Sequence, residues 1–429
     1  MNKELGEQSE MLWGRAERAY KFNSQFNIYP YQEGARLVGD FQKLSEGIPS
    51  AENPTSQEDV YSNELKRRLA GEAVFLDHAL SGHYYTFEDV ISLYGIDKED
   101  TDGLRGWLLG NREEVLETMD RVFASTEVGD LRLPVPSDVP TFRRQAEEFS
   151  ATHIGNYQKK LAKLFEDLTQ VGTFLRDITC LPTTTDRSYF DLYTKMLALS
   201  VPAICYMTED QSLQINEREL IRLFGHEGMG HGLNKIVTEE SNLPKFLKRN
   251  SETTRATVES VAQHFETVIF EDLADSKKTQ GELGIAHKFG EIYQNEKDTR
   301  LINFFQRKLF QYAISVLADK SLGDMSDPEL RKEAIGRRIA LLSEVALFPG
   351  FAVNFVEGNQ HNFDSQGNLS TNLVREMVYA AQPAQKVVSL MEQKGVSYEG
   401  ENRGKIDMLL LSGFWTPIGL VENAQVAKP

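Results

Sequence analysis

The sequence predicts a mainly α-helical protein that carries one small antiparallel sheet. In most of the chain, apolar residues recur three and four positions apart, which is the spacing of an amphipathic helix. Only two adjoining segments are β-prone, Pro202–Met207 and Ser212–Ile215, and a turn at Glu209-Asp210 separates them. The 429 residues are 40% apolar and 26% charged, which is typical of a soluble globular protein with a sizeable core.

The first 127 residues are predicted to form an N-terminal helical region. Helical spacing predicts one helix over Asn63–His78 and another over Thr86–Leu93, whose first residue is a candidate N-cap. Three prolines follow within residues 128–140, and this segment is the predicted linker. We therefore expect a second domain over residues 141–429, which contains all of the candidate functional residues discussed below.

Several further helices are predicted after the linker. They cover Thr141–Leu175, Ser188–Leu199, Asp298–Leu317, Pro328–Leu347 and Leu373–Gln393. The segment Phe348–Gln366 contains glycines, asparagines and His361, and it is predicted as a loop over a cleft. Arg337 and Arg338 are cations that could hold a carboxylate, although such residues more often lie on the surface.

A stretch of twenty residues beginning at Asn216 carries the clearest functional signal. Asn216 is a candidate N-cap with Glu219 three residues on, and an apolar stripe at helical spacing follows. His226 and Glu227 come next, and His231 lies five positions after the first histidine. Residues five apart on a regular helix differ by about 140° in direction. We therefore expect a π-type bulge to bring the two imidazoles together, and the surrounding glycines make this distortion easy.

The two histidines and a downstream glutamate predict a metal site. Imidazole nitrogen is a good zinc ligand, and a carboxylate beside the first ligand can take a proton from water. A catalytic zinc needs three protein ligands, and Glu259 is the candidate for the third, since it lies beside an apolar helical stripe where an unpaired carboxylate is costly. The alternative is a solvated Glu259 and two unrelated histidines. The residues thus predict one zinc ion held by His226, His231 and Glu259.

These motifs resemble those of the tubulin tyrosine carboxypeptidase family, which includes bacterial relatives with a QEGLA motif. The resemblance rests on the two histidines five apart and on a glutamate about 28 positions later, within Thr257–Ala262. The loop Asn242–Leu247 and two later blocks, Arg375–Tyr379 and Gly404–Asp407, are also similar. The likeness covers roughly residues 186–414. This chain has HEGMGH where the family has HEIGTH, and it has Val-Glu-Ser where the family has Gln-Glu-Gly. The chain would therefore be a divergent, gluzincin-like member.

A second family, dipeptidyl peptidase III, also uses two histidines five apart, in a phrase similar to His226–Gly232. Its glutamate ligand lies in an E-E-C-R-A phrase that this chain lacks. Both families hydrolyse peptide bonds. Both resemblances therefore imply a zincin-like metallopeptidase catalytic body, one zinc ion, and a peptide or protein substrate.

The resemblance also implies roles for particular residues. Glu227 is the expected general base, which takes a proton from the attacking water and delivers it to the leaving amine. Tyr379 is the expected donor to the oxyanion. If the protein is a carboxypeptidase, Arg375 or Lys235 would bind the terminal carboxylate of the substrate. A dipeptidyl aminopeptidase would instead need acids near the cleft to bind a free amine.

Two further residues follow Glu259 in its predicted helix. His264 is a rival donor to the oxyanion, although a supporting or core role fits it equally well. Glu266 is expected to orient a ligand histidine, as carboxylates around metal sites often do. A non-catalytic interaction protein with a zinc-stabilised helical fold is the rival from another class of protein.

The charge and the cysteines restrict the partners and the compartment. A net charge of -17 argues against nonspecific binding to nucleic acid or to an anionic membrane. It fits an acidic peptide substrate only if a basic patch lies near the cleft. The two cysteines provide no disulfide framework, the first twenty residues lack the apolar core of a signal peptide, and no apolar run reaches membrane-spanning length. We expect a cytoplasmic protein.

Overall fold

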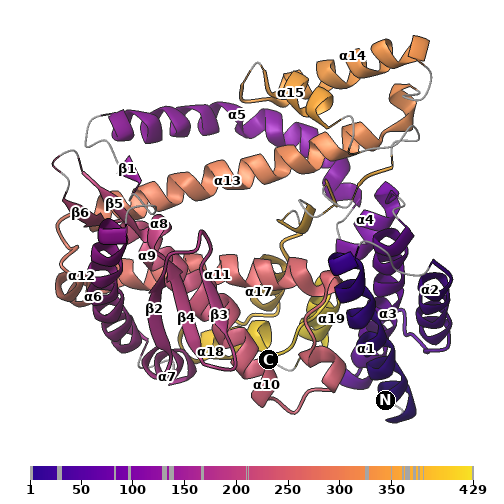
Figure 1. Ribbon diagram of the computed structural model, residues 1–429, viewed down its shortest axis with the longest axis horizontal. Helices are drawn as coiled ribbons and strands as arrows, with labels where there is room; N and C mark the ends of the chain where they lie inside the picture. Colours follow the sequence, from indigo (N-terminus) through magenta and orange to yellow (C-terminus); the bar gives the residue numbers. More distant parts are fainter. Residues whose placement is uncertain are drawn as a thin grey trace.

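The computed structural model is mainly helical and contains two small sheets (Figure 1). This confirms the predicted fold class at the level of a mainly α protein with little β structure. Within the described residues, no helix combines the length and the hydropathy that crossing a bilayer requires. The structure describes all residues except 1–2, 27–30, 82–83, 95–97, 128–132, 135–139, 166–168, 209, 211, 324–327, 349, 360–361, 363–367, 371–372, 375–376, 380 and 428–429.

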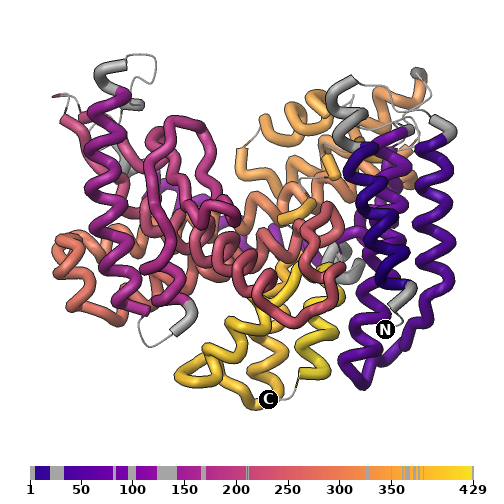
Figure 2. Tube along the Cα trace, turned by 60° about the horizontal axis from the view of Figure 1, so that its bottom comes forward, coloured from indigo at the N-terminus to yellow at the C-terminus, as the bar shows by residue number. Residues whose placement is uncertain are grey.

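The N-terminal helices lie at one end of the molecule and along one of its edges (Figures 1 and 2). They are α1 (Lys3–Phe26), α2 (Tyr31–Glu46), α3 (Gln57–Ser81), α4 (Phe87–Tyr94) and α5 (Lys98–Glu127). Helices α1 to α3 pack side by side, and α5 runs along α13 (Phe289–Ala318). Helices α3 and α4 confirm the two helices predicted in this region. Thr86 caps α4, because its Oγ1 accepts a hydrogen bond of 3.1 Å from the Asp89 N–H.

One of the sheets is antiparallel and has the strand order β1-β5-β6. Its strands are β1 (Leu133–Pro134), β5 (Cys205–Met207) and β6 (Leu213–Ile215). The pair β5-β6 confirms the sheet predicted from the two β-prone segments. Strand β1 comes from the predicted linker, so this part of residues 128–140 pairs with the sheet.

The second sheet is mixed, and the sequence patterns did not indicate it. Strand β4 (Met196–Ser200) pairs in parallel with β2 (Thr179–Thr183) and antiparallel with β3 (Tyr189–Asp191). The helix predicted over Ser188–Leu199 is therefore wrong. Asp191 explains the difference, because its carboxylate accepts hydrogen bonds from the N–H groups of Tyr193 (2.8 Å) and Thr194 (3.3 Å) and stabilises a turn.

A long helix with three consecutive parts lies near the centre of the molecule, next to α11 (Arg255–Asp275) (Figure 1). Its parts are α9 (Glu217–Leu223), the π-helix η1 (Phe224–Leu233) and α10 (Asn234–Glu240). The shorter elements before α11 are α8 (Val201–Ile204), η2 (Lys245–Lys248) and η3 (Glu252–Thr254). The single helix predicted over Thr141–Leu175 is divided into α6 (Pro140–Leu164) and α7 (Thr169–Asp177).

The C-terminal part is also helical. After α11 come α12 (Lys277–Leu283), α13, η4 (Lys320–Leu322), α14 (Pro328–Val345), α15 (Phe351–Gly358), η5 (Met377–Tyr379), α17 (Pro383–Gln393), α18 (Gly400–Leu411) and α19 (Pro417–Val426). The single helix predicted over Leu373–Gln393 is wrong, since α17 begins only at Pro383, which has no N–H to continue a preceding helix.

Two other expectations for this part need correction. Helix α15 occupies part of the loop predicted over Phe348–Gln366, and His361 lies outside the described residues. Arg338 is buried, and its guanidinium donates to the main-chain carbonyl groups of Leu317 and Asp319. This arginine therefore holds the end of α13 and is not open to a carboxylate.

Two large hydrophobic clusters hold the helices together, and each combines residues from both sides of the predicted linker. One includes Trp13 and Leu69 together with Phe265. The other includes Leu108 together with Phe305. The N-terminal helices thus share their core with the later chain.

Arg68 of α3 makes a specific link between the two parts. Its guanidinium is fully buried, lies 5.4 Å from the ring centroid of Trp13, and donates to the carbonyl oxygens of Phe246 and Arg249. Burial lowers the pKa of Arg68 to about 10, so the group stays charged at neutral pH. The N-terminal region thereby fixes the segment that follows α10.

Candidate metal centre

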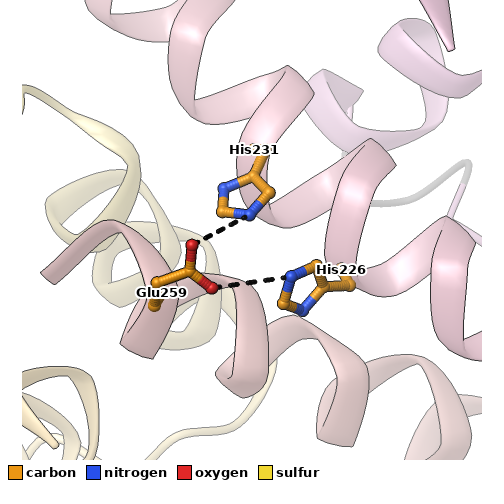
Figure 3. A group of neighbouring side chains, drawn as sticks. All are labelled: His226, His231 and Glu259. Carbon is orange, nitrogen blue, oxygen red and sulfur yellow. Dashed lines mark ion pairs between the residues drawn. The ribbon is translucent and has the colours of Figure 1, made fainter. Parts of the chain in front are cut away.

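The segment with the two histidines forms a π-helix, in agreement with the five-residue spacing. Helix α9 begins at the predicted cap, where Asn216 Oδ1 accepts a hydrogen bond of 3.3 Å from the Glu219 N–H. Because π-helical hydrogen bonds join residues five apart, His226 and His231 lie one above the other on the same side of η1 (Figure 3). Their ring centroids are 4.8 Å apart and their planes are nearly perpendicular.

The glycines of the motif allow η1 to approach α11 closely. A Cβ atom on Gly225 would lie 2.7 Å from the carbonyl oxygen of Phe265, and one on Gly230 would overlap the backbone of Ala262. Neither glycine has a left-handed φ. Their function is therefore close packing, which only a residue without a side chain permits. This packing brings the helix of Glu259 next to the histidines.

Glu259 of α11 completes a cluster of three ligand side chains, and its carboxylate points toward both imidazoles (Figure 3). Its Oε2 lies 3.7 Å from His226 Nε2, and its Oε1 lies 3.9 Å from His231 Nε2. Ligands of a tetrahedral zinc ion are about 3.4 Å apart, so small side-chain shifts would close this cluster around one ion. Two nitrogens and one carboxylate oxygen form a donor set that suits zinc and leaves a fourth position open.

Burial disfavours the charged forms of the groups in this cluster. It raises the pKa of Glu259 and the pKa of Glu227, whose Oε1 lies 4.0 Å from His226 Nε2. It also lowers the pKa of His231 far below its usual range. A bound cation would reverse this preference for both carboxylates and would bind the neutral imidazoles. The electrostatics of Glu259, Glu227 and His231 therefore fit a metal ion, whereas the pKa of His226 is raised, because Glu266 and the other carboxylates outweigh the effect of burial.

Glu266 lies behind His226, where a carboxylate can orient a ligand histidine. Its Oε1 is 2.7 Å from His226 Nδ1 and 2.6 Å from Arg222 Nη1. Burial would raise the pKa of Glu266, but His226 and Arg222 together lower it below the usual value. Arg222 is itself fixed by two hydrogen bonds to Glu219, of 2.9 Å and 2.7 Å. This chain of contacts holds Nδ1 of His226 and leaves Nε2 directed at the cluster.

A cavity of about 480 Å³ opens beside the cluster. Glu227, His231 and Glu259 line it together with Lys235, Glu252 and Arg255 and with residues of the edge strand β3. Lys235 Nζ donates to the carbonyl oxygen of Phe190 in β3 at 3.1 Å, and Arg255 lies 3.4 Å from Glu252. The cavity thus presents both a lysine and an acidic side chain near the candidate metal ligands.

Of two other predicted site residues, the structure describes Tyr379 but not Arg375. Tyr379 of η5 is half-buried, and the guanidinium of Arg307 in α13 lies over its ring, 5.1 Å from the centroid. Arg375 lies outside the described residues. Of the two candidates for binding a terminal carboxylate, only Lys235 is therefore placed at the cavity.

His264 does not join the metal cluster. Its Nε2 lies 2.9 Å from the hydroxyl of Tyr398, which in turn donates to Asp407 Oδ1 at 2.6 Å. In the described part of the chain, the only group of three or more His, Cys, Asp or Glu with metal-ligand spacing is His226, His231 and Glu259. We therefore assign His264 to the packing of α11 against the C-terminal helices.

Sequence patterns did not single out Arg222 and Arg307. Arg222 lies four positions before His226, so helical spacing could have placed it near the ligand. Arg307 gives no such signal, because its position depends on how α13 packs.

Comparisons with models of protein families, with curated proteins and with solved structures find no match for this chain.

Proposed function

We propose that this chain is a zinc-dependent metallopeptidase that uses one zinc ion held by His226, His231 and Glu259. The main support is the meeting of these three side chains from two helices, with Glu227 beside them and a cavity in front. The resemblance of the motifs to the tubulin tyrosine carboxypeptidase family adds to this support and suggests a zincin-like catalytic body.

In this mechanism, zinc supplies Lewis acidity that polarises the scissile carbonyl and acidifies water. Glu227 takes a proton from the attacking water and later delivers it to the nitrogen of the leaving amine, so that the C–N bond breaks and a carboxylate and an amine form. Glu266 keeps the imidazole of His226 oriented throughout.

We further propose that the enzyme removes residues from the C-terminus of its substrate. Lys235 lines the cavity close enough for the charge of Glu227 to act on it, and an ammonium group at this place can bind a terminal carboxylate. Glu252 on the same cavity favours the alternative, an aminopeptidase similar to dipeptidyl peptidase III, since an acid can bind a free amine.

Peptides with blocked ends separate these two activities. A carboxypeptidase cleaves N-acetylated peptides and leaves C-terminally amidated ones intact. An aminopeptidase gives the opposite result. Cleavage of the amidated peptide would therefore refute the carboxypeptidase assignment and leave the metallopeptidase proposal in place.

The variant Glu227→Gln tests whether the site is catalytic. We expect it to retain one zinc ion per chain and to lose on the order of 10³-fold in turnover, because the general base is missing. Glu240→Gln, at an exposed position of α10, is the matched control and should retain full turnover. Metal analysis and peptide hydrolysis measure both properties. If the protein is a zinc-stabilised interaction protein, the unmodified chain shows no hydrolysis. If the unmodified chain binds no zinc, both the metallopeptidase and the zinc-stabilised interaction protein are excluded.

A further inference from the structure

In the described part of the chain, Arg307 is an arginine without an acidic partner near the candidate metal centre. It is half-buried on α13, and its guanidinium lies over the ring of Tyr379. Within the residues that the structure describes, no carboxylate pairs with it and no group forms a hydrogen bond with it. The ring fixes the position of the guanidinium but leaves its N–H donors available.

The other described arginines named here form ion pairs. Arg222 contacts Glu219 and Glu266, and Arg255 contacts Glu252. Glu296, which is buried, lies 3.4 Å from Arg218 and 3.7 Å from Arg300, two turns before Arg307 on the same helix. In a chain with 64 acidic and 47 basic residues, an unpaired arginine in this region is unusual. A partly desolvated cation without a partner is costly, which suggests that an anion binds there during function.

Arg307 and Tyr379 lie on elements that pack against the helix of Glu259. Helix α13 and the turn η5 both pack against α11, which carries Glu259 and Glu266. Burial lowers the pKa of Arg307, and the charges of Glu266 and Glu259 oppose this effect. These two carboxylates are thus close enough to act on the guanidinium, yet neither forms an ion pair with it. When a cation occupies the centre, it takes up the charge of Glu259, and Arg307 remains available.

We propose that Arg307, supported by the ring of Tyr379, binds a negatively charged oxygen of the substrate at the metal centre. The inference rests on the proposed peptidase function. The oxygen belongs either to the free carboxylate at the end of the peptide or to the scissile carbonyl as it gains charge during attack. A guanidinium serves both, because it forms short charge-assisted hydrogen bonds with anionic oxygen.

Arg307→Met tests the proposal, with Lys308→Met as the matched control. Both variants remove one positive charge from half-buried, adjacent positions of α13, but Lys308 lies over Phe304 and has no place at the metal centre in this account. We expect R307M to lose on the order of 100-fold in kcat/KM, which is the effect of removing one donor to a developing oxyanion, and K308M to remain near the unmodified chain. Arg307→Lys should recover part of the loss.

The kinetic constants for one N-acetylated peptide with a free C-terminus identify the oxygen. A loss mainly in kcat assigns Arg307 to the scissile carbonyl, because that oxygen gains charge only during attack. A loss mainly in KM assigns it to the terminal carboxylate, which is charged before attack. Either result supports the proposal. Equal kcat/KM for R307M and K308M overturns it.

Variants of Tyr379 test how the arginine is held. Tyr379→Phe keeps the ring but removes the hydroxyl, whereas Tyr379→Leu removes both. If the ring supports Arg307, Y379F keeps most of its activity and Y379L approaches R307M. If Y379F is as inactive as Y379L, the hydroxyl itself is the donor and the supporting role given to the ring is wrong.

A binding measurement tests the same inference without hydrolysis. Inorganic phosphate is titrated calorimetrically into the zinc-loaded full chain and into its variants. We expect R307M to bind phosphate at least about tenfold more weakly than the unmodified chain and K308M to bind it equally well. Equal affinity of R307M, or no phosphate binding by the unmodified chain, overturns the role of Arg307 while leaving the zinc site intact. A chain that takes up no zinc refutes the proposed function itself.

Discussion

Helix α11 contributes to two clusters of histidine and carboxylate, and they differ in what their polar atoms contact. In the first cluster, the carboxylate of Glu259 faces the Nε2 atoms of His226 and His231 across 3.7 Å and 3.9 Å, which is too long for hydrogen bonds. In the second cluster, His264 and Asp407 share the hydroxyl of Tyr398 at 2.9 Å and 2.6 Å.

The difference shows which cluster can bind a ligand. In the second cluster, the Tyr398 hydroxyl joins His264 of α11 to Asp407 Oδ1 of α18, although Asp407 Oδ2 has no hydrogen-bond partner in the described part of the chain. The ligand atoms of the first cluster converge without bonding to one another and lie beside a cavity. Convergence together with available lone pairs, and not the mere presence of histidine and acid, marks the candidate metal centre.

The largest expected effect concerns metal content. His231→Ala should reduce bound zinc from one ion per chain to nearly none and abolish hydrolysis, because two protein ligands rarely hold zinc tightly. His264→Ala should retain the full zinc content. Elemental analysis of both purified variants checks the result, and equal zinc in the two would show that the clusters are not distinct.

Smaller effects on zinc affinity and stability are expected from changes to two carboxylates, Glu266 beside the first cluster and Asp407 in the second. Glu266→Gln should weaken zinc binding about 10–100-fold, since it removes the carboxylate that orients His226. Asp407→Asn should leave zinc affinity unchanged and lower the free energy of unfolding by about 1–3 kcal/mol, because the half-buried Tyr398 hydroxyl loses a charged acceptor. Competition with a zinc chelator and denaturant unfolding measure the two quantities. Weaker zinc binding by D407N would contradict the separation.

The smallest expected effect concerns the packing of η1 on α11. Gly230→Ala should destabilise the fold by about 1–3 kcal/mol, because the new methyl group would overlap the backbone of Ala262. Gly228→Ala should be nearly neutral, since its Cβ would lie 3.4 Å from the side chain of Leu197 and alanine favours a helix. Denaturant unfolding of both variants checks the difference. Equal stability would mean that close packing does not explain Gly230.

The sequence predicted the central part of the site well because its signals are local. The spacing of His226 and His231 required a distorted helix, and the structure has a π-helix there. Asn216 was also predictable, since a cap depends on neighbours along one helix. The contact of Glu266 with His226 joins two helices, so the sequence could offer Glu266 only as a carboxylate on the same helix as Glu259. The close approach at Gly230 was not predictable, because it depends on which helix packs against η1.

Other features depended on contacts that spacing does not encode. The prediction of a helix over Ser188–Leu199 was wrong because the carboxylate of Asp191 stabilises a turn. The role of His264 as an oxyanion donor could not be separated from a core role, since its partner Tyr398 lies far away in the sequence. Arg307 was missed because its place beside the metal centre is set by the path of α13.

The buried guanidinium of Arg68 has a consequence for any shortened form of the protein. It binds carbonyl groups of the segment that leads into Ser251 and Glu252, and these two residues line the cavity. Proteolytic loss of the first 127 residues would leave those carbonyl groups without their donor and would expose the apolar side of this wall. The N-terminal helices therefore support this wall of the cavity, and a fragment lacking them should not be expected to retain the shape of the cavity.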